Sequence, residues 1–176
     1  MVTTKDGLWE AFANLAERWF YELIVKKMNL FQMSETDVSK TEHNITYTDN
    51  RDGTYTVSTS GTTNASTEVT LGPSISFKQH HVYYIGGAPE SANYNTYFLY
   101  FHTGTGLQDT GGGTVVDRGN YATYSYVPKI KVAYNVTIAT PVVFRPQVYD
   151  LTECFGAGHE PKTVEEFLAY AHEGEV

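Results

Sequence analysis

The sequence predicts an all-β fold, a jelly-roll β-sandwich of about eight or nine strands. Three observations predict this class. Tyr occurs 14 times and Gly 15 times in 176 residues, and Tyr fits pleated sheets whereas Gly fits turns. Short stretches of alternating apolar and polar residues recur from residue 44 to residue 150, separated by Gly-rich turns. No helical pattern falls between these stretches, which argues against a parallel α/β sheet.

The first predicted element is an amphipathic helix over residues 4–28, within an N-terminal segment of residues 1–30. Its apolar residues follow steps of three and four and form one wide face. That face either packs on the chain's own domain or mediates assembly or docking, and it spans too few heptads to predict a coiled coil. The candidate interface consists of Leu8, Trp9, Phe12, Leu15, Trp19, Phe20 and Leu23.

The predicted β-sandwich domain covers residues 31–149. Asp52-Gly53 between two alternating stretches predicts a hairpin. Along residues 130–138, alternation places Val132, Tyr134, Val136 and Ile138 on one face. The strands are expected at residues 44–48, 54–58, 67–71, 75–77, 82–85, 96–102, 121–126, 130–138 and 142–148. The triple glycine at 111–113 is expected to form a flexible hairpin loop.

The third zone, residues 150–176, predicts a short helical tail. Thr163 and Glu166 have the spacing of a capping box, in which each side chain accepts a hydrogen bond from the backbone near the other. The next two helical turns have one apolar side, which indicates a short helix. Its apolar residues are Val164, Phe167, Leu168 and Ala171.

Charge and composition exclude several function classes. The chain carries 20 acidic and 12 basic side chains, a formal net charge of -8, whereas nucleic-acid binding needs a basic face. No apolar run is long enough for membrane insertion, and the N-terminus does not resemble a signal peptide. The single cysteine, Cys154, cannot form an intrachain disulfide or a thiolate-rich zinc site.

The C-terminal segment resembles a motif of virion proteins. Residues 150–161 read DLTECFGAGHEP, and residues 163–167 read TVEEF. This stretch is similar to a motif in tail-fibre and other virion proteins of bacteriophages and prophages, roughly DLT-x-hydrophobic-FGAG-(N)EP-x-TVEEF. In this chain His159 stands where Asn is commoner, and Cys154 stands where Met or a similar apolar residue is usual.

The resemblance extends upstream more loosely. Residues 142–148 look like the final strand of the jelly-roll modules that precede this motif, and residues 52–57 look like their first hairpin. The resemblance implies a virion location, other virion proteins as partners, and a β-sandwich similar to carbohydrate-binding modules. Fibres and head spikes are commonly trimers, so it also implies a homo-oligomer, with a trimer as the expected form.

The sequence favours a non-enzyme without a cofactor. It contains no Gly-x-Ser-x-Gly elbow and no His-Glu-x-x-His motif. Cys154 lies among apolar residues, which is typical of a buried, inert thiol. Asp49 and Asp52 offer clustered oxygen ligands that could hold calcium, but a plain hairpin turn explains them better, and we expect no metal.

Sugar binding is the ligand hypothesis with the clearest physical basis. Sugars stack their C–H faces on aromatic rings, and the strand region is rich in tyrosine. Tyr94, between two asparagines in a loop, is the best single candidate, joined by Tyr121 and His102. Contacts between subunits would use the same rings, so a purely structural use stays open.

Two functions therefore follow from the sequence. The first is a non-enzymatic bacteriophage structural protein, a head-fibre, decoration or small tail-fibre component that oligomerises through its N-terminal helix and binds glycans with the β-sandwich. The alternative is a free-standing carbohydrate-binding adhesin, in which the helix folds onto the sandwich. Oligomeric state distinguishes the two.

Overall fold

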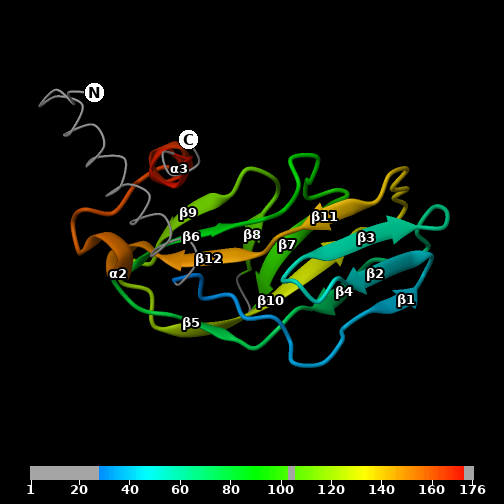
Figure 1. The fold of residues 1–176 in the computed structure, drawn as a ribbon, viewed down its shortest axis with the longest axis horizontal. Coiled ribbons are helices and arrows are strands. Elements are labelled where there is room, and N and C mark those ends of the chain that lie inside the picture. The colour runs from blue at the N-terminus through cyan, green and yellow to red at the C-terminus, as the bar shows by residue number, and fades with distance from the viewer. Residues whose placement is uncertain (1–27, 103–105, 173–176) are drawn as a thin grey trace, which may run out of the picture.

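The described chain is mostly β-strand, in three antiparallel sheets with few helices, which is consistent with a β-sandwich (Figure 1). The computed structural model describes residues 28–102 and 106–172. The predicted N-terminal helix and its interface residues Leu8, Trp9, Phe12, Leu15, Trp19, Phe20 and Leu23 lie outside these described residues. Their predicted assembly role therefore stays a prediction.

The first two sheets supply most of the core. One has the order β1-β2-β3-β11, and the other has the order β4-β10-β7-β8, with β5 paired to the first part of β10. The first consists of β1 (Lys40–Glu42), β2 (Ile45–Asp49), β3 (Tyr55–Thr59) and β11 (Val142–Phe144). The second consists of β4 (Thr67–Thr70), β5 (Ile75–Phe77), β7 (Tyr97–His102), β8 (Leu107–Asp109) and β10 (Tyr124–Val132).

The third sheet has the order β12-β6-β9, from β12 (Gln147–Asp150), β6 (Val82–Gly86) and β9 (Thr114–Asp117). Inward side chains from all three sheets form one cluster of buried residues, which includes Val57, Leu99, Ile130 and Val148. Alternation of apolar and polar residues along β2 and β10 drives this arrangement, because successive strand side chains point to opposite faces.

Several predicted strands are confirmed, and the hairpin between residues 44–48 and 54–58 is observed as β2 and β3. The prediction of two strands at 121–126 and 130–138 is wrong, because β10 runs through as one strand and ends at Val132. Beyond it Asn135 has a left-handed φ of 60°, which a strand does not tolerate. The prediction that Tyr134 shares a face with Val136 and Ile138 is also wrong, because Tyr134 is 66% exposed whereas Val136 and Ile138 are buried.

The predicted strand 142–148 is also divided. β11 pairs with β3 and β12 pairs with β6, so the chain changes sheets at Arg145-Pro146. Proline lacks the amide hydrogen that a continuous ladder needs. The glycines at 111–113 likewise link β8 to β9, strands of two different sheets, so the expectation of a hairpin loop there is wrong.

The segment that enters the domain covers the edge of β12. The Leu30 amide donates to the Val148 carbonyl at 2.7 Å, and Asn29 Oδ1 accepts from the amides of Phe31 and Val148 at 3.0 and 2.9 Å. These bonds satisfy backbone groups that a bare strand edge would expose. The chain thus enters the domain beside β12, where the tail begins.

The C-terminal motif closes the third sheet. Asp150 caps α2 (Leu151–Phe155) by accepting from the Glu153 amide at 3.1 Å. Thr163 Oγ1 accepts from the Glu166 amide at 3.1 Å at the start of α3 (Val164–His172), so the first bond of the predicted capping box is confirmed. The Glu166 side chain reaches one residue further back than expected, to the Lys162 amide at 2.6 Å.

The helix α3 lies over the outer face of the third sheet (Figure 1). Phe167 is buried, with its ring centroid 4.5 Å from that of Tyr84 and 5.4 Å from that of Tyr149. Between the helices, Gly156 and Gly158 have φ of 87° and 84°, a region that residues with a Cβ rarely adopt. Asp150, Thr163, Phe167 and the two glycines therefore all have a role in folding the tail.

Candidate functional site

The candidate site is built around Arg118, in the loop between β9 and β10. The loop is held against the turn that joins β5 to β6: the Arg118 amide donates to the His81 carbonyl at 2.9 Å, and the His80 amide donates to the Gly119 carbonyl at 2.8 Å. Within the loop the Tyr121 amide donates to the Arg118 carbonyl at 2.9 Å. The side chain of Arg118 is thereby fixed beside the start of β10.

The Arg118 side chain forms an aromatic cluster with three tyrosines. Its guanidinium carbon lies 5.3 Å from the ring centroid of Tyr121, 6.0 Å from that of Tyr124 and 5.5 Å from that of Tyr126. We call these four residues the Arg118 cluster. A cation over the faces of aromatic rings is attracted by their quadrupoles, which accounts for the position of a charged group that is only 5% exposed.

The hydrogen-bonding capacity of Arg118 is largely unused. Nη2 donates to the Ala122 carbonyl at 3.4 Å, a long bond, and the buried Nε has no acceptor among the described residues. The ion pairs that the structure gives for the described part of the chain do not include Arg118. A buried donor without a partner costs free energy. Either the attraction of the rings offsets this cost, or a ligand supplies the acceptor.

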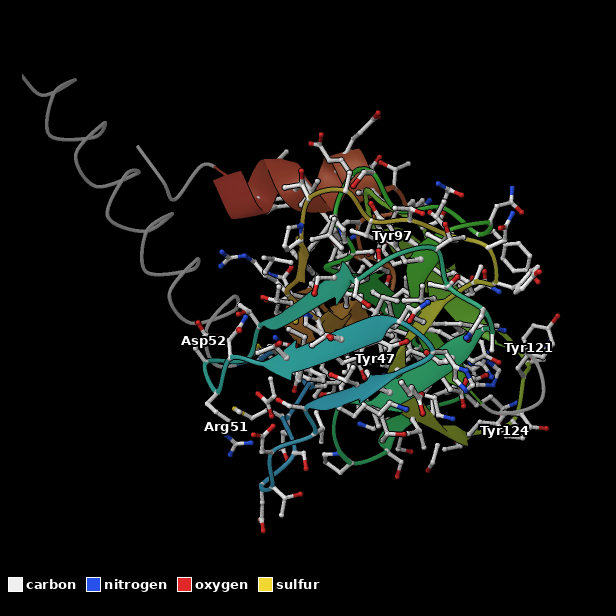
Figure 2. All side chains as sticks on the ribbon, turned by 90° about the vertical axis from the view of Figure 1, so that its right-hand side faces the viewer. Tyr47, Arg51, Asp52, Tyr97, Tyr121 and Tyr124 are labelled. Atoms are coloured by element: carbon white, nitrogen blue, oxygen red, sulfur yellow. The ribbon has the colours of Figure 1, made fainter. Side chains whose placement is uncertain are left out.

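Two rings of the Arg118 cluster face solvent. Tyr121 is 68% exposed and Tyr124 is 50% exposed, whereas Tyr126 is buried. Figure 2 shows Tyr121 and Tyr124 at one side of the molecule, away from Arg51 and Asp52 at the other side. Exposed rings with a polar end suit the C–H face of a sugar together with its hydroxyl groups.

Tyr94 belongs to a different surface. It is 64% exposed, and its ring is stacked on Phe98 with centroids 5.4 Å apart and an interplanar angle of 20°. Lys131 Nζ lies 6.0 Å from the Phe98 ring centroid and 5.9 Å from that of Tyr100. We call these four residues the Lys131 cluster.

The predicted sugar-binding residues do not form one site. The loop of Tyr94 adjoins the Val132 end of β10, where the Ala133 amide donates to the Thr96 carbonyl at 2.7 Å. Tyr121 precedes the other end of β10, at Tyr124. Because a strand rises about 3.3 Å per residue, this strand separates Tyr94 from Tyr121 by more than one sugar can span. The backbone of His102 pairs with Val127, and its side chain lies outside the described residues.

The acidic hairpin is organised by its own turn. Both Asp49 oxygens are engaged, by the Arg51 amide at 2.9 Å and by Arg51 Nη1 at 2.9 Å. Asp52 Oδ1 accepts from the Thr54 amide and hydroxyl at 2.9 and 2.6 Å. The Thr54 hydroxyl, and secondly its amide, hold the pKa of Asp52 below its ordinary value. This geometry matches the plain hairpin turn that the sequence favours.

One group in the described part of the chain could offer three metal ligands, and the sequence analysis did not identify it. Ligand atoms of His81, Asp150 and Glu153 lie within 4.8 Å of one another. His81 Nδ1 lies 2.9 Å from Asp150 Oδ2, and Lys78 Nζ lies 2.8 Å from Glu153 Oε1. These side chains are thus paired with one another or with Lys78, and Asp150 also caps α2, so the group is accounted for by the fold.

Cys154 lies on α2 and is half-buried, with its Sγ 3.8 Å from Met28 Sδ. Burial, and secondly the charges of Asp150 and Glu153, raise its pKa to about 12. The thiolate is the reactive form, so this thiol is a poor nucleophile at neutral pH.

Two hollows flank Arg145, of about 570 Å³ and 550 Å³. The larger is lined by Phe31, Asp52 and Pro146, and the other by Tyr84, Pro89 and Leu168. Neither hollow contains a residue of the Arg118 cluster. The Arg118 cluster therefore belongs to neither hollow, and it presents the exposed rings of Tyr121 and Tyr124 to solvent.

The sequence analysis included Tyr121 but missed Arg118. The available signal was weak: Arg118 is followed by tyrosines at three, six and eight residues. Only the loop conformation, set by backbone bonds to His80 and His81, brings those rings around the guanidinium.

No family model, curated protein or solved structure matches the chain. Among the helices of the described residues, none is both long enough and apolar enough to cross a membrane.

Proposed function

We propose that the chain is a non-enzymatic structural component of a bacteriophage virion, of the head-fibre, decoration or small tail-fibre type, whose β domain binds glycans at the Arg118 cluster. It works with other virion proteins as a homo-oligomer, with the N-terminal helix as the assembly element. The domain is a jelly roll in this proposal. Pairs between strands far apart in the chain, such as β3 with β11 and β4 with β10, support that topology.

The observation that carries the glycan-binding part is the pair of exposed tyrosines over a buried cation. Tyr121 is 68% exposed and Tyr124 is 50% exposed, yet the guanidinium carbon of Arg118 lies within 6.0 Å of both ring centroids. Rigid amphipathic rings supply stacking area at low entropic cost. The guanidinium beneath them adds a charged hydrogen-bond donor to the same cluster.

The virion part rests on the resemblance of the C-terminal motif. Its residues cap two helices and bury Phe167 on the third sheet. This arrangement, in which the motif folds the tail onto the β domain, is compatible with the order of jelly roll and motif in those virion proteins. The virion context is inferred from that resemblance. The raised pKa of the Cys154 thiol, at about 12, supports the non-enzymatic part, because it argues against thiol catalysis.

Glycan binding is tested with the full chain. An array of bacterial surface and host glycans is probed, and the affinity for any sugar bound is then measured by calorimetry for Tyr121→Ala and Tyr124→Ala. Each variant should weaken binding about tenfold, about the value of one aromatic stacking contact. Tyr134→Ala, at a residue 66% exposed outside the cluster, is the matched control and should bind like the wild type.

Equal affinity in Tyr121→Ala, Tyr124→Ala and the wild type would contradict the assignment of the site, and no binding to any glycan would contradict glycan binding altogether. Oligomeric state separates the proposal from the free-standing adhesin, which would be a monomer.

A further inference from the structure

We infer that the Arg118 cluster takes an acidic sugar, whose carboxylate pairs with the Arg118 guanidinium while its ring stacks on Tyr121 or Tyr124. This inference rests on the proposed function, and it names the class of sugar. The shared chemistry is a carboxylate on a pyranose ring, as found in uronic acids and in sialic acids.

Arg118 has no counter-charge among the described residues. The chain carries a net charge of -8, so acidic partners are plentiful, yet no carboxylate among the described residues pairs with Arg118. The adjacent Asp117 instead accepts from the Gly119 amide at 2.7 Å through Oδ1. A buried cation without an anion is costly, and the rings offset that cost only in part. An anionic ligand would supply the missing charge.

Arg118 also has a hydrogen-bond donor, Nε, that is unused among the described residues. A guanidinium presents five N–H donors in a planar fork that matches a carboxylate, with Nε and one Nη nitrogen able to bind its two oxygens. In Arg118 the Nε donor is buried and has no acceptor among the described residues, and the bond of Nη2 is long at 3.4 Å. A carboxylate satisfies both needs at once, whereas a neutral hydroxyl satisfies only one.

Polar groups of Gln79, Asn120 and Thr123 form the rim of the Arg118 cluster. Beside the rings, the Gln79 side chain donates to the Asn120 carbonyl at 3.2 Å, and the Gln79 amide donates to the Thr123 hydroxyl at 3.3 Å. These exposed polar groups flank Tyr121 in the chain and across the turn, and we expect the hydroxyls of a stacked sugar to find partners among them. Cation, rings and rim thus correspond to the carboxylate, the C–H face and the hydroxyls of one acidic sugar.

Access to the guanidinium requires one ring to move. Tyr121 is the ring that moves, because it is 68% exposed and lies in a loop. Tyr126 stays in place, since it is buried at 1% exposure in β10. On binding, the Tyr121 ring turns from the guanidinium to the sugar, so its fluorescence and its aromatic NMR signals should change with an acidic ligand.

The test compares matched ligand pairs on the full chain by calorimetry or NMR titration. The probes are 3′-sialyllactose against lactose, and cellobiouronic acid against cellobiose. The acidic member of at least one pair should bind about tenfold or more tightly than its neutral partner, about the effect of one charge-assisted hydrogen bond. The pair that shows the difference identifies the source of the carboxylate, and the preference should decrease at high salt.

Variants locate the effect. Arg118→Gln should abolish the preference for the acidic sugar, and Arg118→Lys should keep part of it, because lysine retains the charge but not the fork. Lys131→Gln in the Lys131 cluster, also a cation over aromatic rings, is the matched control and should keep the full preference. Thermal unfolding of each variant shows whether it is folded; if Arg118→Gln is not, the ligand pairs on the wild type and on Tyr121→Ala still decide.

The outcomes are distinct. Equal binding of acidic and neutral sugars, lost in Tyr121→Ala, would overturn the acidic-sugar inference and leave the proposed glycan function standing. A preference that survives Arg118→Gln in a folded protein would overturn the role of Arg118. Absence of binding to every sugar would overturn both the inference and the glycan part of the proposed function.

Discussion

Burial controls the chemistry of the single cysteine. The pKa of Cys154 is raised to about 12 from an ordinary value of 9.0, so the thiolate fraction at a given pH falls about a thousandfold. We predict that Cys154 reacts with a disulfide reagent at pH near 8 at least about tenfold more slowly in the folded chain than in denaturant, because the higher nucleophilicity of a high-pKa thiolate offsets only part of its lower abundance. Similar rates in the two states would show that the thiol is open to solvent.

Glu160 gives the tail a pH dependence. The Thr152 hydroxyl donates to its Oε1 at 2.7 Å, and this bond is the largest cause that holds its pKa below the ordinary value. The unfolded chain therefore binds a proton here more readily than the folded chain does. This contribution to the free energy of unfolding is present above the ordinary carboxyl pKa and is lost as the pH falls through the lowered one.

Glu160→Gln tests that contribution. Denaturant unfolding of the variant and the wild type should show lower stability for the variant at about pH 7. The difference should shrink as the pH falls through the lowered pKa of Glu160, because the wild-type carboxyl then becomes protonated too. Thr152→Val should reduce the pH dependence in the same way, although Thr152 also accepts from the Val82 amide at 3.0 Å. A difference that is constant with pH would contradict the assigned cause.

The role of a single residue is predictable from the sequence where it depends on neighbouring residues, and not where it depends on contacts with distant parts of the chain. Asp49 and Asp52 were correctly favoured as turn residues, since Asp-Gly specifies a hairpin locally. Arg118 was missed because its importance depends on a loop that bonds to a distant turn. Tyr94 and Tyr121 were joined in one hypothesis because composition does not show that β10 lies between them.

At the element scale, α3 depends on one aromatic residue. Phe167 is buried against Tyr84 and Tyr149, with ring centroids at 4.5 and 5.4 Å. Phe167→Ala should lower the free energy of unfolding by about 3–5 kcal/mol, the usual cost of truncating a buried aromatic residue. Urea denaturation followed by circular dichroism measures it.

Glu165→Ala is the control for that variant, because Glu165 is an exposed residue of the same helix. It should change the free energy of unfolding by less than about 0.5 kcal/mol. A comparable loss in both variants would mean that α3 is not held by the contact of Phe167 with the sheet.

Elements with a strong local code were predictable. The hairpin of β2 and β3 and the capped helix α3 follow from alternation, Asp-Gly and a capping box. The division of residues 142–148 at Pro146, and the end of β10 before Asn135, depend on which sheet each part joins. The short strands β1, β8 and β9 have three or four residues each, too few for a periodic pattern to be recognised.

At the scale of the whole molecule, Asn29 links the entering chain to the third sheet. Its Oδ1 accepts from two amides, at 3.0 and 2.9 Å, and its Nδ2 donates to the Pro146 carbonyl at 3.4 Å. Asn29→Ala leaves these groups without partners and should cost about 1–3 kcal/mol of unfolding free energy. Hydrogen exchange at the Val148 amide should rise with it, and unchanged protection there would contradict the role given to Asn29.

The all-β class followed from composition and alternation, which act over the whole domain. The division into three sheets could not be predicted, because β3 and β11, or β4 and β10, are brought together by packing across long stretches of chain. The proposed assembly of the molecule depends on the predicted apolar face of residues 8–23. This segment lies outside the described residues.

The most direct test of the central claim, an assembling virion component, is the mass of the full chain in solution by light scattering. We expect an oligomer, whose mass is at least twice the 19.7 kDa of one chain. A single charged substitution on the apolar face, Leu15→Asp, should reduce the mass to that of one chain while leaving the β domain folded. A full-length chain that stays a monomer at high concentration would contradict the account and favour the free-standing adhesin.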